Sequence, residues 1–193
     1  MSEVTARIGM LVGSLRVGAN SAALARALPG LAPEACRLDI LPSVGALPHF
    51  DQDILDGEGA PEAVTQLAEA VAALDGLILV TPEYNWSIPG ALKNALDWLS
   101  RLRPMPLAGK PVLIVSNSPG LLGGARVHPP LREVLHALDC RILARPEIQI
   151  ARVAGKLDRE ADRISDPDTA EFIAARLAAF AAFIAAETPG RSG

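Results

Sequence analysis

The chain has 193 residues, half of them hydrophobic, which is enough for one sizeable core and argues against intrinsic disorder. Its 18 basic and 22 acidic residues leave a net charge of −4, which argues against binding to nucleic acid or to an anionic membrane surface. The N-terminus lacks the pattern of a signal peptide, and no apolar run approaches the roughly 20 residues of a membrane span. Cys36 and Cys140 stand far apart, without the spacing of a metal site. We therefore expect one cytoplasmic domain over residues 1–193, with reduced thiols.

Strands and helices are expected to alternate along the chain. Short apolar runs predict strands at residues 7–12, 36–41, 77–80 and 111–116, and an interrupted fifth strand at 141–143 and 147–150. Apolar residues at helical spacing predict helices at 20–31, 61–74, 89–101 and 130–137, and a last helix from Pro167 with Asp166 as its N-cap. Residues 42–59 and 151–165 are expected to be loops, and residues 188–193 a frayed tail.

This alternation indicates the class of fold. Short buried strands separated by helices favour a parallel sheet that is covered on both faces, which is a three-layer α/β/α sandwich. Five strands fit the flavodoxin-like order 2-1-3-4-5 better than a six-stranded dinucleotide-binding sheet. In that order, the loops after the first, third and fourth strands meet at one edge of the sheet, where open α/β sheets bind ligands.

The first of these loops runs from Gly13 to Ser21 and has the composition of an anion site. Its glycines permit tight turns, the following helix start favours negative charge, and Arg16 offers a forked cation for phosphate oxygens. It matches neither the Walker A pattern nor GxGxxG. The alternative is an ordinary strand–helix turn with Asn20 or Ser21 as the helix cap.

The second and third loops supply polar and aromatic groups. The second carries Glu83, Tyr84, Asn85 and Ser87, and Ser87 also fits the N-cap of the following helix. We do not expect Glu83 to act as a general acid, because no partner carboxylate or histidine is near it in sequence. The third loop, residues 116–126, holds repeated glycines that would let a flat ligand lie against backbone. A ligand with a phosphate at one end and a flat polar ring at the other fits the three loops, and FMN is such a ligand.

The chain resembles the family of NAD(P)H-dependent FMN reductases, including its quinone- and chromate-reducing members. The resemblance covers most of the chain and rests on GSLR at residues 13–16, PEYN-x-S-x-PG-x-LKNA-x-DW at 82–98 and SxSPG-x-x-GGAR at 116–126. It implies phosphate contacts from Ser14, Arg16 and either Asn20 or Ser21, which the altered order at residues 19–21 leaves open. It implies contacts to the flavin ring and ribityl chain from Pro82, Glu83, Tyr84, Asn85 and Ser87, and a border of the ring formed by Ser116, Ser118, Gly120 and Gly124.

The resemblance also implies a reaction and an assembly. Our hypothesis is ping-pong hydride transfer from NAD(P)H through N5 of non-covalently bound FMN to a quinone or similar small acceptor. No catalytic side chain or metal ligand is expected, because the flavin carries the chemistry, and His49, His128 and His136 show no ligand spacing. The family implies a homodimer or homotetramer, with Trp98 and Arg126 as interface candidates. The alternatives are a flavodoxin-type FMN electron carrier without a substrate site and a flavin-free regulatory or scaffold protein.

Overall fold

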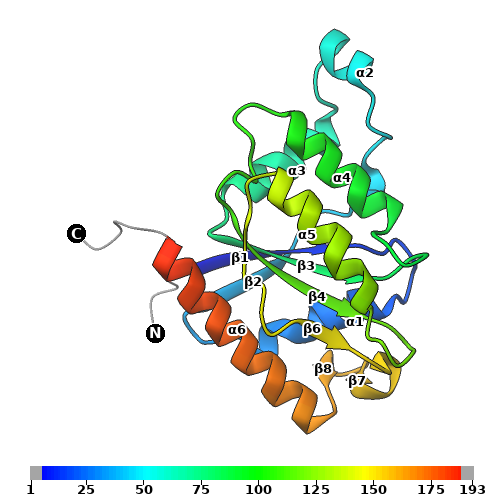
Figure 1. Cartoon of the computed structure of the whole chain (residues 1–193), viewed down its shortest axis with the longest axis vertical. Helices are drawn as coiled ribbons and strands as arrows, with labels where there is room; N and C mark the ends of the chain where they lie inside the picture. The colour runs from blue at the N-terminus through cyan, green and yellow to red at the C-terminus, as the bar shows by residue number, and fades with distance from the viewer. Residues whose placement is uncertain (1–5, 188–193) are drawn as a thin grey trace.

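The computed structural model describes residues 6–187, which contain one parallel sheet with helices on both of its faces (Figure 1). The strands lie in the order β2-β1-β3-β4-β5, and β6 also pairs with β4. Their bounds are β1 (Ala6–Val12), β2 (Cys36–Ile40), β3 (Gly76–Pro82), β4 (Pro111–Asn117), β5 (Arg141–Ile142) and β6 (Ile148–Ile150). The flavodoxin-like order is therefore confirmed, and β5 and β6 together form the interrupted fifth strand along the outer edge of β4.

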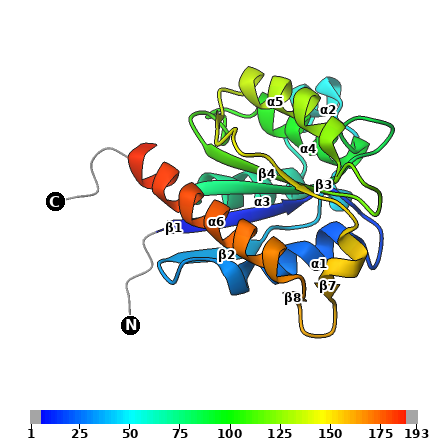
Figure 2. The same ribbon diagram turned by 60° about the horizontal axis from the view of Figure 1, so that its bottom comes forward.

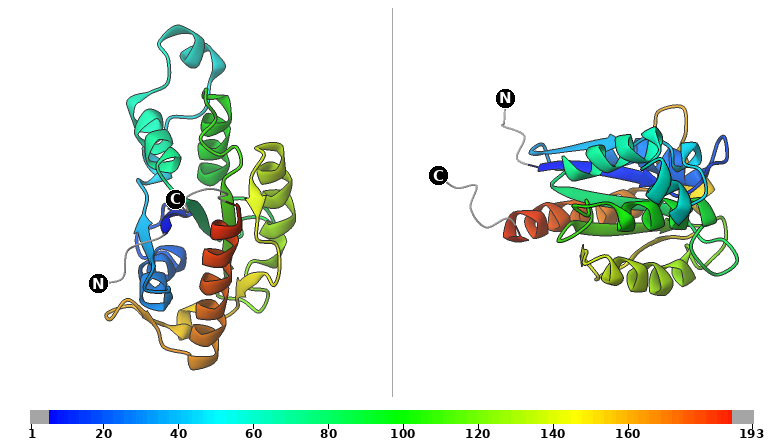
Figure 3. Two further views of the ribbon diagram at one scale, coloured as in Figure 1. Left: turned by 90° about the vertical axis from the view of Figure 1, so that its left-hand side faces the viewer. Right: turned by 90° about the horizontal axis from the view of Figure 1, so that it is seen from above.

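Two helical layers enclose the sheet (Figure 3). One face is covered by α3 (Glu62–Ala72), α4 (Gly90–Arg101) and α5 (His128–Ala137), and the other by α1 (Asn20–Ala27) and α6 (Pro167–Glu187). Strand β3 shows why both faces need cover: Leu77 and Leu79 lie in the first core cluster, whereas Ile78 and Val80 lie in the second. Successive side chains of a strand point to opposite faces, so an uninterrupted apolar run requires a helical layer on each side.

Three segments differ from the expected pattern. The helix predicted at 20–31 ends at Ala27 and continues as a 3₁₀ turn over Leu28–Leu31, in which Pro29 lacks the backbone N–H of a regular helix. The expected loop at 42–59 contains a 3₁₀ turn at Val44–Ala46 and α2 (Gln52–Gly57). The expected loop at 151–165 contains a 3₁₀ turn at Val153–Lys156 and an antiparallel hairpin formed by β7 (Leu157–Asp158) and β8 (Arg163–Ile164).

Helix α6 begins as the sequence predicts. The backbone N–H of Thr169 donates to Oδ1 of Asp166 at 3.1 Å, which confirms Asp166 as the cap. The apolar stripe of the helix is buried against the sheet by Ile173, Leu177, Phe180 and Ile184. By length and composition, residues Pro167–Ala186 could cross a membrane, with a mean hydropathy of 1.6 and 28% of the window buried; core helices of water-soluble proteins meet the same criteria. The predicted frayed tail at 188–193 lies outside the described residues.

One predicted surface residue belongs to the core instead. Trp98 is completely buried, its Nε1–H donates to the carbonyl of Pro48 at 2.8 Å, and its ring meets that of Phe50 edge-on at 5.0 Å. The expectation that Trp98 contacts a second subunit is therefore wrong, because helix α4 turns this side chain inward. Both cysteines are free thiols, and burial raises the pKa of Cys140 to about 12.

Candidate cofactor-binding site

The three loops singled out in the sequence emerge side by side from the sheet. Strands β1, β3 and β4 are neighbours and run parallel, with Val12 paired to Val80 and Thr81 paired to Ser116. The segments that follow these strands are called here the first loop (residues 13–19), the second loop (83–89) and the third loop (118–124). Because parallel strands end at the same edge, the three loops surround one place at the carboxyl edge of the sheet.

The first loop leaves β1 close to β3 and ends at an uncapped helix. A Cβ atom on Gly13 would lie 2.5 Å from Oγ1 of Thr81, so only glycine fits there. Helix α1 begins at Asn20 with Ala19 as its N-cap, and no side chain caps it. Neither Asn20 nor Ser21 is thus the cap that the alternative reading of the sequence required. The first N–H groups of α1 have no intrahelical partner and can bind an anion.

Asn20 and Ser21 are adjacent in sequence but have different surroundings. Ser21 is 1% exposed, and its hydroxyl accepts a hydrogen bond from Nδ2 of the buried Asn117 at 3.0 Å. Asn117 also donates to the carbonyl of Thr81 at 3.3 Å, so it joins α1 to the ends of β3 and β4. Asn20 is only partly buried and lies at the edge. Asn117 was missed in the sequence, where it reads as one more polar residue of a turn.

The second loop is built on a two-residue reverse turn. The backbones of Tyr84 and Ser87 bond to each other in both directions, at 3.1 and 2.9 Å, and both residues between them, Asn85 and Trp86, have positive φ. This is the pattern of a tight hairpin turn, in which asparagine is favoured and a bulky tryptophan is unusual. Ser87 lies two residues before the N-cap of α4, which is Pro89, so the prediction that Ser87 caps this helix is wrong.

Side chains of the second loop bind its two neighbours. The hydroxyl groups of Tyr84 and Ser14 are 3.0 Å apart, which links the second loop to the first. On the other side, Oε2 of Glu83 accepts from the backbone N–H of Arg126 at 2.8 Å. The guanidinium of Arg126 lies 4.1 Å from the centre of the Trp86 ring, a cation–π contact. Glu83 thus ties the second loop to the segment that directly follows the third loop.

The third loop packs down against β6, and its glycines make that approach feasible. Gly123 and Gly124 both have positive φ, and a Cβ on Gly123 would lie 2.6 Å from the carbonyl carbon of Gln149. Ser118 and Gly120 lie farther out, where Ser118 Oγ donates weakly to the Gly120 carbonyl at 3.4 Å. This loop therefore packs its Gly123–Gly124 segment against the sheet, while its outer part carries exposed apolar side chains.

Ser116 lies beneath the third loop and not on its surface. It is completely buried, and its hydroxyl donates to the carbonyl of Gly123 at 2.8 Å. Nε2 of His128 lies 2.9 Å from the same hydroxyl. Since the single hydroxyl proton points to Gly123, Nε2–H of His128 is the donor in the second bond. Burial lowers the pKa of His128, which favours the neutral form of the ring. The predicted cofactor contact of Ser116 thus becomes support for the loop, a role it shares with a histidine that the sequence did not single out.

Exposed apolar side chains occur in all three loops. Five of them have at least half of their surface in solvent: Leu15, Val17, Trp86, Leu121 and Leu122. Single exposed apolar residues are common, but a set of them around one edge is typical of a binding surface. We call these five residues the apolar rim. They surround an edge that offers cationic and N–H donors on the side of the first loop.

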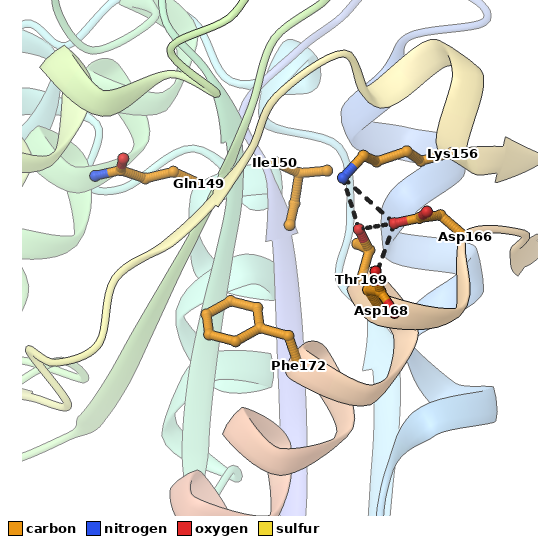
Figure 4. A pocket seen from close by; sticks show the side chains of 7 residues that line it. All are labelled: Gln149, Ile150, Lys156, Asp166, Asp168, Thr169 and Phe172. Carbon is orange, nitrogen blue, oxygen red and sulfur yellow. Dashed lines mark hydrogen bonds and ion pairs between the residues drawn. The ribbon is translucent and has the colours of Figure 1, made fainter.

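A separate hollow lies near the start of α6 and does not coincide with this edge (Figure 4). It has a volume of about 320 Å³ and is lined by Gln149, Ile150, Lys156, Asp166, Asp168, Thr169 and Phe172. Lys156 Nζ donates to Thr169 Oγ1 at 2.7 Å and lies 3.3 Å from Asp166 Oδ1. Two of the charged groups that line this hollow, Lys156 and Asp166, are therefore already paired with each other.

The donor set at the edge fits an FMN phosphate and ring. The uncapped start of α1, the Ser14 hydroxyl and the Arg16 guanidinium are donors that suit a dianionic phosphate. Exposed apolar side chains in the third loop and aromatic surface in the second suit a ring system. Neither the donor groups nor this surface is characteristic of a site that catalyses hydrolysis or nucleophilic substitution without a cofactor.

Comparison with known proteins agrees with this assignment. The profile of the family described as NADPH-dependent FMN reductase matches residues 6–155. The chain is 44% identical over 174 residues to a quinone reductase of Escherichia coli (strain K12), covering 90% of this chain and 93% of that protein. It is 39% identical over 168 residues to an NAD(P)H-dependent FMN reductase of Pseudomonas aeruginosa, covering 86% and 89% of the two proteins.

A solved structure has the same fold along nearly the whole chain. The flavoenzyme FerB of Paracoccus denitrificans, described as an NAD(P)H:(acceptor) oxidoreductase, superimposes with a TM-score of 0.85 at 30% identity. The match covers 95% of this chain and 99% of that one. The strand order, the three loops at one edge and these matches lead to one conclusion: the chain belongs to the NADPH-dependent FMN reductase family.

Proposed function

We propose that this protein is a single-domain enzyme that uses FMN and NAD(P)H to reduce quinones or similar small acceptors. The observation that carries the proposal is the division of the edge into two unlike halves. The first loop offers a cation and the uncapped start of α1, whereas the second and third loops offer exposed aromatic and apolar surface. Relatives named quinone reductase and 2-hydroxy-1,4-benzoquinone reductase, 44% and 36% identical, support the choice of acceptor.

The residues of the site then have distinct tasks. Arg16, Ser14 and the start of α1 at Asn20 and Ser21 hold the phosphate, with the contact of Ser21 made by its backbone because its hydroxyl is occupied. The flavin ring and ribityl chain lie against the second and third loops. Their contacts come from Pro82, Glu83, Tyr84, Asn85, Ser87, Ser118, Gly120 and Gly124, while Ser116 supports the third loop from below.

FMN, when bound, supplies the redox chemistry by accepting hydride from NAD(P)H and passing it to the acceptor. The protein contributes position and exposure. Because the second and third loops are open to solvent at Trp86, Leu121 and Leu122, one face of a bound ring would stay accessible to a second flat molecule. Exposed Trp86 and Tyr84 would border that face. A nicotinamide and a quinone could occupy it in turn, which is the requirement of a ping-pong reaction.

The oligomeric state and the cellular location of the protein are inferred from its surface, its thiols and its charge. We infer a homodimer or homotetramer, because the apolar rim leaves hydrophobic surface beside the site, and Arg126 lies next to it over Trp86. We also infer a cytoplasmic enzyme, supported by two free thiols and by a net charge of −4, which disfavours nucleic-acid and anionic-membrane partners.

An anaerobic titration tests the function. The purified protein should show flavin absorption that bleaches with NADPH or NADH and returns when a benzoquinone is added. Steady-state rates at several fixed quinone concentrations should give parallel double-reciprocal lines. A colourless protein that binds no added FMN contradicts the proposal. Flavin that NAD(P)H does not reduce, but that accepts electrons from a reductase, would indicate a flavodoxin-type carrier instead.

A pair of arginine variants tests the phosphate half of the site. Arg16→Ala should weaken FMN binding about 10- to 100-fold, since hydrogen bonds to charged groups contribute about 1.5–3 kcal/mol. Arg37→Ala is the matched control, because Arg37 is an exposed arginine near the amino end of β2, paired with Asp39 at 2.8 Å. Unchanged FMN affinity in Arg16→Ala at matched salt would remove Arg16 from the site.

A further inference from the structure

The hairpin formed by β7 and β8 is fixed against α1 and α6 (Figure 2). At its base, Lys156 Nζ donates to Thr169 Oγ1 of α6 at 2.7 Å (Figure 4). Beside its turn, Asp162 Oδ1 pairs with Arg26 Nε of α1 at 2.7 Å. A short two-stranded hairpin is marginal by itself, so these attachments determine where its turn lies.

The turn of this hairpin delivers Arg159 to the end of the first loop. Its Nη1 donates to the carbonyl of Gly18 at 3.1 Å, and its Nη2 donates to Oδ1 of Asn20. Arg159 is 139 residues from Asn20 in sequence, so only the tertiary fold brings them together. A second guanidinium thus lies at the place where Arg16 and the start of α1 already favour an anion.

These two contacts change what the first loop offers to a phosphate. An amide side chain has one acceptor and one donor group, and the acceptor of Asn20 is occupied by Arg159. The donor, Nδ2, is left for another partner. The Gly18 carbonyl, which would repel a phosphate oxygen, is likewise covered by Nη1. The neighbouring Ser21 hydroxyl is buried against Asn117, so it does not compete for this role.

We propose that Arg159 is a positioning residue of the phosphate subsite, acting through Asn20. By holding Oδ1 of Asn20 and the carbonyl of Gly18, it orients the end of the first loop so that donors alone face a phosphate monoester. The inference rests on the proposed function, because it presumes that FMN phosphate binds at the start of α1. It also selects Asn20 over Ser21 as the side chain that contacts the phosphate.

Titrations with FMN and riboflavin separate this role from general support of the fold. The flavin-free full-length protein is titrated with each ligand by fluorescence quenching. Arg159→Ala should weaken FMN binding about 10- to 100-fold and make the FMN affinity less dependent on salt concentration. Riboflavin affinity should stay unchanged within about twofold. Arg159→Lys should recover part of the loss, because it keeps the charge without the two-point fork. In the double variant with Asn20→Ala, the two losses should be less than additive.

The control is Arg163→Ala on the same hairpin, where Arg163 Nε pairs with Asp158, five residues away, at 2.9 Å. It should leave FMN affinity unchanged. FMN affinity preserved in Arg159→Ala, an equal loss for FMN and riboflavin, or an equal loss in Arg163→Ala would each overturn the proposal. If the unaltered protein binds riboflavin and FMN equally, the role of Arg159 fails while flavin binding stands. If it binds neither, the proposed function itself fails.

Discussion

Removal of the Ser116 hydroxyl should loosen the third loop without unfolding the protein. Ser116 is completely buried, and its Oγ is shared by the Gly123 carbonyl at 2.8 Å and Nε2 of His128 at 2.9 Å. The Ile148 carbonyl lies 3.3 Å away from the same oxygen. In Ser116→Ala, the Gly123 carbonyl and Nε2 of His128 lose a close partner in a place that water cannot reach.

The size of the effect follows from the groups left unpaired. A buried donor or acceptor without a partner costs about 1–3 kcal/mol, and two such groups that relax in part cost about 2–4 kcal/mol together. Globular domains have stabilities of about 5–15 kcal/mol, so Ser116→Ala should stay folded. FMN affinity should fall as well, because the Gly123–Gly124 backbone is no longer held in place.

Urea denaturation of the flavin-free protein measures the loss. The control is Ser118→Ala, which removes a hydroxyl with a bond of 3.4 Å in the same loop and should change stability by less than about 0.5 kcal/mol. A double-mutant cycle with His128→Leu should be non-additive, because the second change removes a group that the first leaves unpaired. A loss below about 0.5 kcal/mol in Ser116→Ala, or strict additivity, would refute the role given to this hydroxyl.

Three further predictions test the remaining parts of the structure. Because burial lowers the folded-state pKa of His128, stability should be complete above the ordinary histidine pKa of about 6.5 and decline as pH falls below it, a slope that His128→Leu should reduce in urea titrations. Gly123→Ala should cost more than the roughly 1–2 kcal/mol of a left-handed alanine, since its Cβ meets Gln149 backbone at 2.6 Å; Gly109→Ala, also at positive φ but with open space, should show the conformational cost alone. Trp98→Ala should destabilise by about 3–5 kcal/mol with no effect on subunit number by light scattering, because the ring is buried within one subunit.

Strand positions could be predicted because a strand covered by helices on both faces is an uninterrupted run of apolar residues. Residues 77–80 and 111–115 are apolar on both faces, and both lie in inner strands of the sheet. The strand order came from the general architecture of alternating elements, and the three loops followed from it. The helices were located by their apolar stripes, which left charged residues for the outer face. On the outer face of α4, for example, Lys93 and Asp97 form an ion pair at 2.6 Å.

The residues that were misjudged are polar or aromatic side chains whose partners are distant in sequence. Ser116 and Ser118 look alike in the sequence, yet one is buried under the third loop and the other lies near its surface. Trp98 looked like an interface residue, but Pro48 and Phe50 from another part of the chain enclose it. Residues 151–165 carry many charges, and such a composition is typical of a loop. Partners of several of these charged side chains lie in α1 and α6, which the sequence does not reveal.

The amino-acid sequence by itself therefore determined the layers, the strand order, the edge at which we propose that FMN binds, and the family. These features depend on local periodicity and on short motifs, which are readable without knowing any long-range contact. The tertiary structure alone decided which polar groups of that edge already have a partner within the protein. It placed Arg159 on Asn20, turned Ser21 toward Asn117 and buried Ser116 beneath Gly123. The reason is physical: a side chain's role depends on which hydrogen-bonding partner already satisfies it, and those partners come from elsewhere in the chain.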